Sequence, residues 1–332
     1  MKSRIIVFLL SIISIIVAFG VILYIKNDKT VDFPHYKQAY YKMSGSMNVI
    51  KDTAFDLPLI FIDANEMSEM SSSENIKSID IYDGNSQKLN VQKWHIEENL
   101  KGTSYVIRTI QAEVIMNEEG TFKPEKFSIT YKDNVTKKYD FGDFNIICKS
   151  DDYYSDNLAA GIICDINPVV TAQNKDGFPY SGLSLFIKGN TEEFKVDKIN
   201  LGINEFGIEK DNLVCFQTED DLNVIMNYVR DGLSKNEPWA ENLSRINLVD
   251  SVSNDINPFT VEVPSENHGT NILVPLTRLK NVSMNQVMIF NIDITLNIEG
   301  QEKHFIKFQP YYVTPFTFNQ SGMYQYLEEA GI

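Results

Sequence analysis

Residues 290–298 read FNIDITLNI, and their apolar side chains stand at every second position. An alternation with a period of two places one set of side chains on one face of a β-strand and the other set on the opposite face. Phe290, Ile292, Ile294 and Leu296 therefore form a buried face, with polar residues between them. This stretch predicts a half-buried strand of an antiparallel sheet.

The same pattern occurs earlier in the chain, at 127–131, which reads FSITY. Each stretch is followed by a polar, turn-like segment, KDNVTKK at 132–138 and EGQEK at 299–303. A second aromatic strand then follows, YDF at 139–141 and HFIKF at 304–308. Both regions are predicted to be β-hairpins.

The two hairpins also align with each other at a fixed offset, which matches Ile129 with Ile294, Thr130 with Thr295 and Lys138 with Lys303. Similar strand-like segments precede each hairpin. We therefore expect a mainly β protein with two antiparallel β-sandwich modules of immunoglobulin-like architecture, at 46–149 and 178–318. Residues 150–177 are expected to form a linker that contains a strand. At Gly142 the apolar positions change parity, which predicts a bulge that redirects the chain.

One segment departs from the β pattern. Residues 218–248 carry apolar side chains at helical spacing, with Thr218 and Asp221 as a capping box and Pro238 in the first turn of a second helix. We expect a small helical insertion in the second module, and a candidate interaction surface formed by Tyr228, Trp239 and Leu243. The alternative is that both helices only cover an open edge of a sheet. Residues 319–332 are expected to form a short C-terminal helix.

The amino terminus contains an uninterrupted apolar segment from Ile5 to Ile25. A helix of that length spans about 30 Å, the thickness of the hydrocarbon core of a bilayer. Residues 1–25 are thus predicted to be a single-pass transmembrane signal-anchor helix, with the bulk of the chain extracytoplasmic at the cell membrane. A signal peptide cleaved after Ala18-Phe19-Gly20 is the alternative.

Residues 26–45 are predicted to be a juxtamembrane segment. Aromatic and basic residues alternate there, with Phe33, Tyr40 and Tyr41 among the aromatic ones. Trp, Tyr and basic side chains are typical of the bilayer interface, so this composition favours a retained anchor.

The chain of 332 residues has a formal net charge of -15. Such a surface repels phosphate polymers, so nucleic acid is not an expected partner. The frequent Asn, Ile and Lys residues are typical of an AT-rich bacterial genome.

The three cysteines, Cys148, Cys164 and Cys215, each lie in a short apolar run, and we expect them to be buried. Cys148 and Cys164 flank an acidic, turn-like segment. If they face each other across a hairpin, they form a candidate disulfide in an oxidising compartment.

The four histidines, His35, His95, His268 and His304, are isolated from one another in the sequence. No motif of a zinc site, a nucleophile elbow or a phosphate-binding loop is found. The sequence predicts no catalytic, metal-binding or cofactor-binding residue, and non-enzymatic action is favoured. Calcium at the acidic loops, and a carboxylate pair assembled only in three dimensions, remain open alternatives.

These observations favour a membrane-anchored extracytoplasmic binding or accessory protein that acts through protein or envelope contacts of its β modules. Two alternatives are an envelope-facing hydrolase with a dispersed active site, and a structural subunit of a membrane complex whose transmembrane helix packs on a partner.

Overall fold

The computed structural model describes the body of the chain from Gln38 to Val313, with gaps. The described residues are 38–63, 68–101, 105–154, 162–170, 180–189, 193–209, 213–218, 222–238, 240, 247–253, 255–262, 269–280, 286–306 and 310–313. The predicted anchor at 1–25 and the predicted C-terminal helix at 319–332 lie outside these residues. Among the described helices, none combines the length and apolar composition needed to cross a bilayer.

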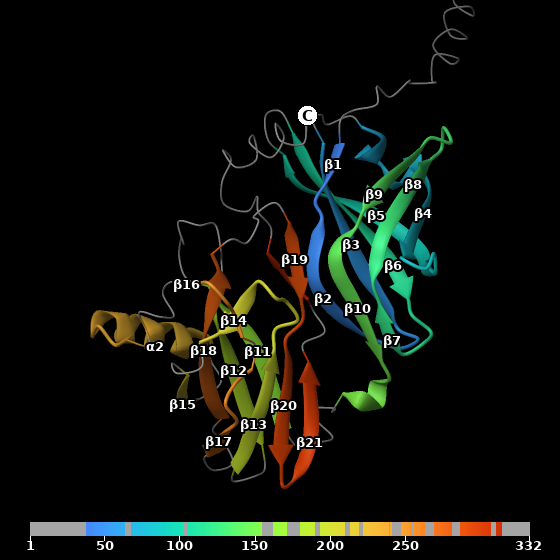
Figure 1. The fold of residues 1–332 in the computed structure, drawn as a ribbon. Coiled ribbons are helices and arrows are strands. Elements are labelled where there is room, and N and C mark those ends of the chain that lie inside the picture. The colour runs from blue at the N-terminus through green and yellow to red at the C-terminus, as the bar shows by residue number, and fades with distance from the viewer. Residues whose placement is uncertain are drawn as a thin grey trace, which may run out of the picture.

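The described chain is mainly β, as predicted, and its strands form four sheets (Figure 1). The largest is a seven-stranded sheet built from the first half of the sequence. Its strands in spatial order are β1 (Gln38–Tyr40), β3 (Ala54–Asp63), β6 (Val106–Ile115), β5 (Lys88–Lys101), β4 (Ile76–Asp83), β8 (Pro124–Tyr131) and β9 (Thr136–Asp140).

A five-stranded sheet combines strands from the two halves of the sequence. Three of its strands precede residue 150 and two follow residue 286. In spatial order they are β22 (Tyr311–Val313), β19 (Val287–Phe290), β2 (Met43–Ile50), β10 (Gly142–Lys149) and β7 (Gly120–Phe122).

Two further sheets come from the second half. The six-stranded sheet contains β11 (Ile162–Val170), β12 (Tyr180–Gly189), β18 (Gly269–Leu279), β14 (Phe206–Ile208), β15 (Val214–Thr218) and β16 (Asn247–Val249). The four-stranded sheet contains β17 (Phe259–Glu262), β13 (Glu193–Asn200), β20 (Asp293–Ile298) and β21 (Gln301–Ile306).

Helical structure is sparse in the described residues. Three short 3-10 turns are present, η1 (Glu69–Ser71), η2 (Ser73–Asn75) and η3 (Asp151–Tyr153). The predicted amphipathic helix is confirmed as α2 (Leu222–Ser234), although Leu233 is 40% exposed and not buried as the pattern suggested.

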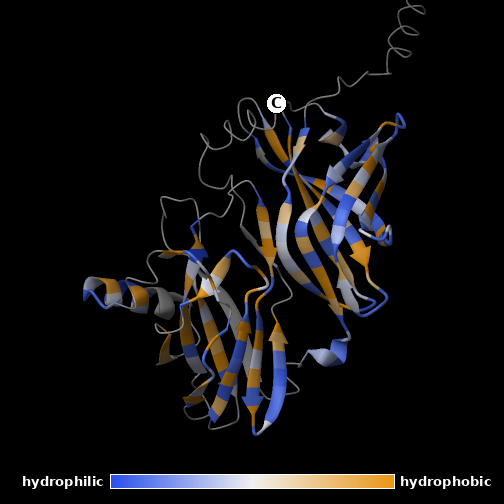
Figure 2. Ribbon diagram, in the orientation of Figure 1, coloured by the Kyte–Doolittle hydropathy of each residue, from blue (hydrophilic) through white to orange (hydrophobic). Residues whose placement is uncertain are grey.

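Both predicted hairpins are confirmed, although the predicted strand at 290–298 is divided, because Phe290 ends β19 and β20 begins at Asp293 in another sheet. β8 and β9 pair antiparallel, with Ile129 opposite Lys137, and β20 and β21 pair antiparallel, with Ile294 opposite Phe305. The alternation of apolar and polar residues along β8 and β20 is visible in Figure 2. Most described strand pairs are antiparallel, as predicted. The pairs β2–β10, β2–β19 and β16–β18 are parallel, which the sequence patterns did not predict.

The parity change at Gly142 marks a switch between sheets. β9 ends at Asp140 in the seven-stranded sheet, and β10 starts at Gly142 in the five-stranded sheet. Gly142 has a φ of +115°, and a Cβ at this position would overlap the backbone of Met43. Glycine is therefore required where β10 begins directly beside Met43 of β2.

Buried apolar side chains form two main cores. The first lies between the seven-stranded and five-stranded sheets, and the second is formed by the six-stranded and four-stranded sheets with β19. Strand β19 contributes to both, because Val287 and Ile289 face the first core whereas Met288 and Phe290 face the second. One strand of four residues therefore belongs to both cores (Figure 1).

Two aromatic residues of the predicted juxtamembrane segment are placed differently from the prediction. Tyr40 is 8% exposed and Tyr41 is 1% exposed, and both belong to the first core. Their assignment to an aromatic belt at the bilayer surface is wrong, because β1 pairs with β3 and buries these rings inside the protein.

Candidate functional site

The predicted interaction surface is only partly described. Tyr228 of α2 is half-buried, and its ring stacks on Phe216 of β15 with the ring centres 4.1 Å apart. Next to it, Val229 packs against Leu273 of β18. Trp239 and the side chain of Leu243 lie outside the described residues. In the described part, α2 thus packs on a face of the six-stranded sheet, and the wider surface stays a prediction.

The cysteines differ in exposure. Cys148 forms no disulfide with another described residue and is fully buried in β10, whereas Cys215 is exposed, so the predicted burial of Cys215 is wrong. β15 is an edge strand whose Val214 and Phe216 face α2, and Cys215 points to the opposite side. The backbones of β10 and β11 lie in different sheets, so the expected hairpin between Cys148 and Cys164 is absent from the described strands. The side chain of Cys164 is not among the described side chains, so the disulfide between Cys148 and Cys164 stays a prediction.

A buried ionic cluster lies at the end of β3. Asp63 is 0% exposed and is bound by the guanidinium of Arg108 and by the hydroxyl of Ser68, which donates to its Oδ2 at 2.7 Å. Burial raises the pKa of Asp63, and the hydrogen bond from Ser68 and the charge of Arg108 oppose that rise. Ser68 also accepts from the backbone of Met70, so the cluster fixes the start of η1 against the sheet. Its role is structural.

No group of three or more His, Cys, Asp or Glu side chains that would hold a metal ion exists among the residues described. Two pockets lined by described residues are further candidates, and they lie on β2 and the segments beside it. The smaller, of about 370 Å³, is polar and is lined by Ser46, Asp143, Asn145 and the 200–205 segment. The hydroxyl of Ser46 donates to the carbonyl of Gly202 at 2.8 Å, and this hydrogen bond connects two of the segments that line the polar pocket.

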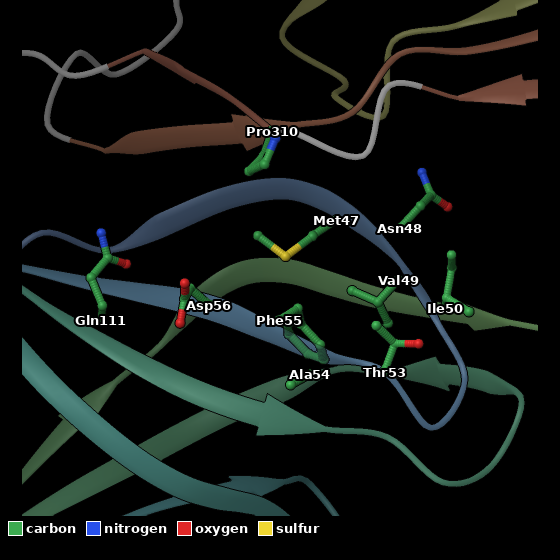
Figure 3. Close-up of a pocket in the computed structure, with 10 residues that line it drawn as sticks. All are labelled: Met47, Asn48, Val49, Ile50, Thr53, Ala54, Phe55, Asp56, Gln111 and Pro310. Carbon is green, nitrogen blue, oxygen red and sulfur yellow. The ribbon is translucent and has the colours of Figure 1, made fainter.

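The larger pocket has a volume of about 510 Å³ and a mainly apolar lining. This volume falls in the range typical of ligand sites, which is about 300–1,000 Å³. Its walls come from both halves of the chain (Figure 3), and the lining residues are Met47, Asn48, Val49, Ile50, Thr53, Ala54, Phe55, Asp56, Gln111 and Pro310. We refer to this site as the Pro310 pocket.

The floor of the Pro310 pocket is the connection between β2 and β3. The turn at Lys51–Asp52 is fixed by backbone hydrogen bonds to two other segments, from Lys51 to Lys149 and from Asp52 to Met116, each 2.8 Å long. Asp52 has a φ of +60°, and its carboxylate accepts from Asn117 at 2.8 Å. These bonds hold the turn in one conformation, so the floor is preformed.

The roof of the pocket comes from the far end of the sequence. Pro310 directly precedes β22, and β22 pairs antiparallel with β19. β19 in turn pairs in parallel with β2, the strand that supplies four lining residues. Directly after β19, the buried Asn291 adds a further contact with β2, because its Oδ1 accepts from the backbone N–H of Asn48 at 2.8 Å. The pocket is therefore complete only when both halves of the chain are assembled.

Polar side chains line the pocket at both ends, Asp56 and Gln111 at one and Asn48 and Thr53 at the other. Figure 3 shows Asp56 and Gln111 together, with Ile50 and Thr53 at the opposite end and Met47 between them. The Nε2 of Gln111 donates to Glu97 at 3.2 Å, whereas its Oε1 is buried without a hydrogen-bond partner among the described residues. A buried acceptor left unpaired costs about 1–3 kcal/mol, so this end favours a ligand that donates a hydrogen bond.

Sequence reasoning did not identify these lining residues. MNVIKDTAF at 47–55 reads as an ordinary strand, turn and strand, and Gln111 occupies a polar position of an alternating strand. No local pattern indicates that Pro310 lies above them. No protein-family model matches the chain, and a comparison with curated proteins finds no significant relative.

Proposed function

We propose that the protein is a single-pass membrane-anchored binding protein whose β body lies outside the cytoplasm and engages another protein through the Pro310 pocket. The apolar segment at 5–25 supplies the anchor, and the first strand, β1, starts shortly after it at Gln38. The body then corresponds to two immunoglobulin-like β-sandwich modules that share β19.

The observation that carries this proposal is the construction of the pocket from both halves of the chain. A preformed, mainly apolar pocket with a few polar groups is the usual form of a binding site. Its floor is held by backbone hydrogen bonds to two other segments and its roof by β22, so little ordering is required on binding. Preformed sites lose less entropy when they bind, which favours recognition.

The position of the pocket also fits an anchored body. β1 lies at one end of the molecule and the β20–β21 turn at the opposite end, and the pocket lies between them on β2 (Figures 1 and 3). A short connection from the bilayer to β1 leaves this middle region accessible to a partner in the same membrane or in the envelope.

The test is position-specific photo-crosslinking of the full chain in native membranes. A photoreactive amino acid replaces Ala54, an exposed pocket residue, and in a matched control it replaces Glu237, an exposed residue beyond the end of α2. We expect a discrete adduct from position 54 only, in a membrane fraction that resists carbonate extraction. Release of the protein by carbonate, or equal adducts from both positions, contradicts the proposal.

A further inference from the structure

The end of the Pro310 pocket at Asp56 and Gln111 contains acceptors and negative charge. In the β3–β6 register Pro58 lies opposite Gln111 and Asp56 lies opposite Glu113, so Asp56 and Gln111 are diagonal neighbours on one face of the sheet. The Oε1 of Gln111 is buried without a partner among the described residues, and the carboxylate of Asp56 is exposed. Both groups accept hydrogen bonds and neither donates one.

Lys93, a cation beside this end of the pocket, is engaged mainly by Glu113, and its charge also acts on Asp56. Lys93 forms an ion pair with Glu113 at 2.9 Å, and Glu97 accepts from the amide of Gln111. Within the described residues, Asp56 has no ion-pair partner. A ligand at this end is therefore favoured when it brings a cationic donor, because that group pairs with Asp56 while an N–H satisfies Gln111.

Most of the rest of the lining is apolar, although it also contains Asn48 and Thr53. Met47, Val49, Phe55 and Pro310 supply apolar surface, and the pocket volume of about 510 Å³ accommodates a bulky side chain with the backbone beside it. Burying a large apolar side chain contributes about 1.5–3 kcal/mol. The ligand thus combines an apolar group with a neighbouring cation.

We infer that the Pro310 pocket binds a segment of a partner polypeptide in which a lysine or arginine adjoins a large apolar residue. The apolar side chain occupies the region between Met47 and Pro310, and the cation pairs with Asp56. The net charge of -15 also favours a basic partner segment, because an acidic surface attracts basic segments during encounter. This inference rests on the proposed function and names the chemistry of its partner.

The test measures binding of a dye-labelled peptide that carries two Arg-Leu pairs in a Gly-Ser background. The full chain is held in zwitterionic nanodiscs, empty nanodiscs give the baseline, and fluorescence anisotropy gives the Kd. We expect Asp56→Lys and Ala54→Trp each to raise the Kd by about tenfold or more, since 1.4 kcal/mol corresponds to tenfold. Glu237→Lys, a charge reversal away from the pocket, is expected to leave the Kd unchanged.

Two further peptides define the chemistry. Replacing Arg by Glu, or Leu by Ser, is expected to abolish binding to the wild-type chain, and an excess of octylamine is expected not to displace the Arg-Leu peptide. Equal binding of the Arg-Leu and Glu-Leu peptides, or an unchanged Kd in Asp56→Lys, overturns the inference. If either occurs while crosslinking at position 54 still captures a partner, the inference about the ligand fails and the proposed function stands.

Discussion

The two hydrophobic cores differ in composition and in the origin of their residues. The first core is rich in aromatic rings, and Tyr40, Phe61, Phe127, Tyr139 and Phe141 form a network with ring centres 4.7–6.3 Å apart. The second core is mainly aliphatic and has fewer aromatic rings, among them the pair Phe290 and Tyr311 with ring centres 5.7 Å apart. Offset and edge-to-face ring pairs add directional packing to the hydrophobic effect, so the first core is more sensitive to shape.

The cores also depend on each other unequally. All buried members of the second core come from Leu183 onward, whereas the first core takes Val287 and Ile289 from β19. The first core is therefore incomplete until a strand from the end of the sequence is in place. The first core and the Pro310 pocket therefore depend on strands from the end of the sequence. Substitutions in the first core or at its contact with β19 should have larger effects than a substitution confined to the second core.

Replacing Asp63 by Ala is expected to be the most damaging change. It leaves the guanidinium of Arg108, 3% exposed, buried without its main partner. Removing one member of a buried ion pair costs about 3–5 kcal/mol. Urea unfolding of the full chain in detergent gives the free energy of unfolding. The double variant Asp63→Leu with Arg108→Met is the control and is expected to recover most of the loss. A loss under about 1 kcal/mol in Asp63→Ala would argue against a buried pair.

Ile289→Ala tests whether β19 supports the first core. Ile289 is 0% exposed, and truncation of a buried isoleucine costs about 2–5 kcal/mol. Because its side chain faces the first core, we expect the environment of Trp94, whose ring packs against that core, to be perturbed in near-ultraviolet circular dichroism. Met288→Ala, on the opposite face of β19, is the matched variant and is expected to leave the Trp94 signal unchanged. The reverse pattern would contradict the assignment of faces.

Gly45→Ala tests the close contact between β2 and β19. Gly45 has a φ of +105°, and a Cβ there would overlap the backbone oxygen of Ile289. Strain together with this overlap is expected to cost about 1–3 kcal/mol. Gly300→Ala is the matched control, because Gly300 also has a positive φ, +82°, but a Cβ at that position would meet no atom within 4 Å. Equal losses of thermal stability in the two variants would show that the strand contact contributes nothing.

Asp293→Asn is expected to have the smallest effect and to depend on pH. Burial raises the pKa of Asp293, and the charges of His304 and Lys198 oppose the rise. The folded state therefore holds the proton more tightly than the unfolded state. The contribution of the Asp293 carboxyl to folding stability is fully present at low pH. It is lost as the pH rises from the ordinary pKa of 3.8 through the raised pKa of the folded state.

Asn carries no charge, so the stability of Asp293→Asn relative to the wild type should increase as the pH rises from about 4 to 7. Urea unfolding at several pH values measures this difference. Asp63 titrates in both proteins, so its contribution cancels in the comparison. A stability difference that decreases as the pH rises would contradict the direction given for the pKa of Asp293.

Much of the local structure follows from the sequence. The alternation at 127–131 and 290–298 predicts both hairpins, and helical spacing predicts α2. The shared strand β19 is not predicted, because the alternation is clear only from Phe290 onward. The preceding residues Val287, Met288 and Ile289 are also apolar, and such a run is typical of a strand buried on both faces.

The Pro310 pocket could not be predicted in the same way. Its floor and roof are separated by more than half of the sequence, and they meet only through the parallel pairing of β2 with β19. Parallel partners are not joined by a short turn, so no local pattern announces them. Composition alone wrongly predicts that Tyr40 and Tyr41 lie at the bilayer interface. The pairing of β1 with β3, which buries them, leaves no signal in the local sequence.

Hydrogen exchange of Gly45→Ala in increasing urea separates the stability of the first core from that of the second. The full chain in nanodiscs is compared with wild type by mass spectrometry of peptides from β2 and β10 and from β12 and β18. If the first core depends on its contact with β19, the substitution lowers the urea concentration at which β2 and β10 lose protection, while β12 and β18 keep theirs. Unchanged protection of β2 and β10, or an equal loss in all four strands, would contradict this unequal dependence.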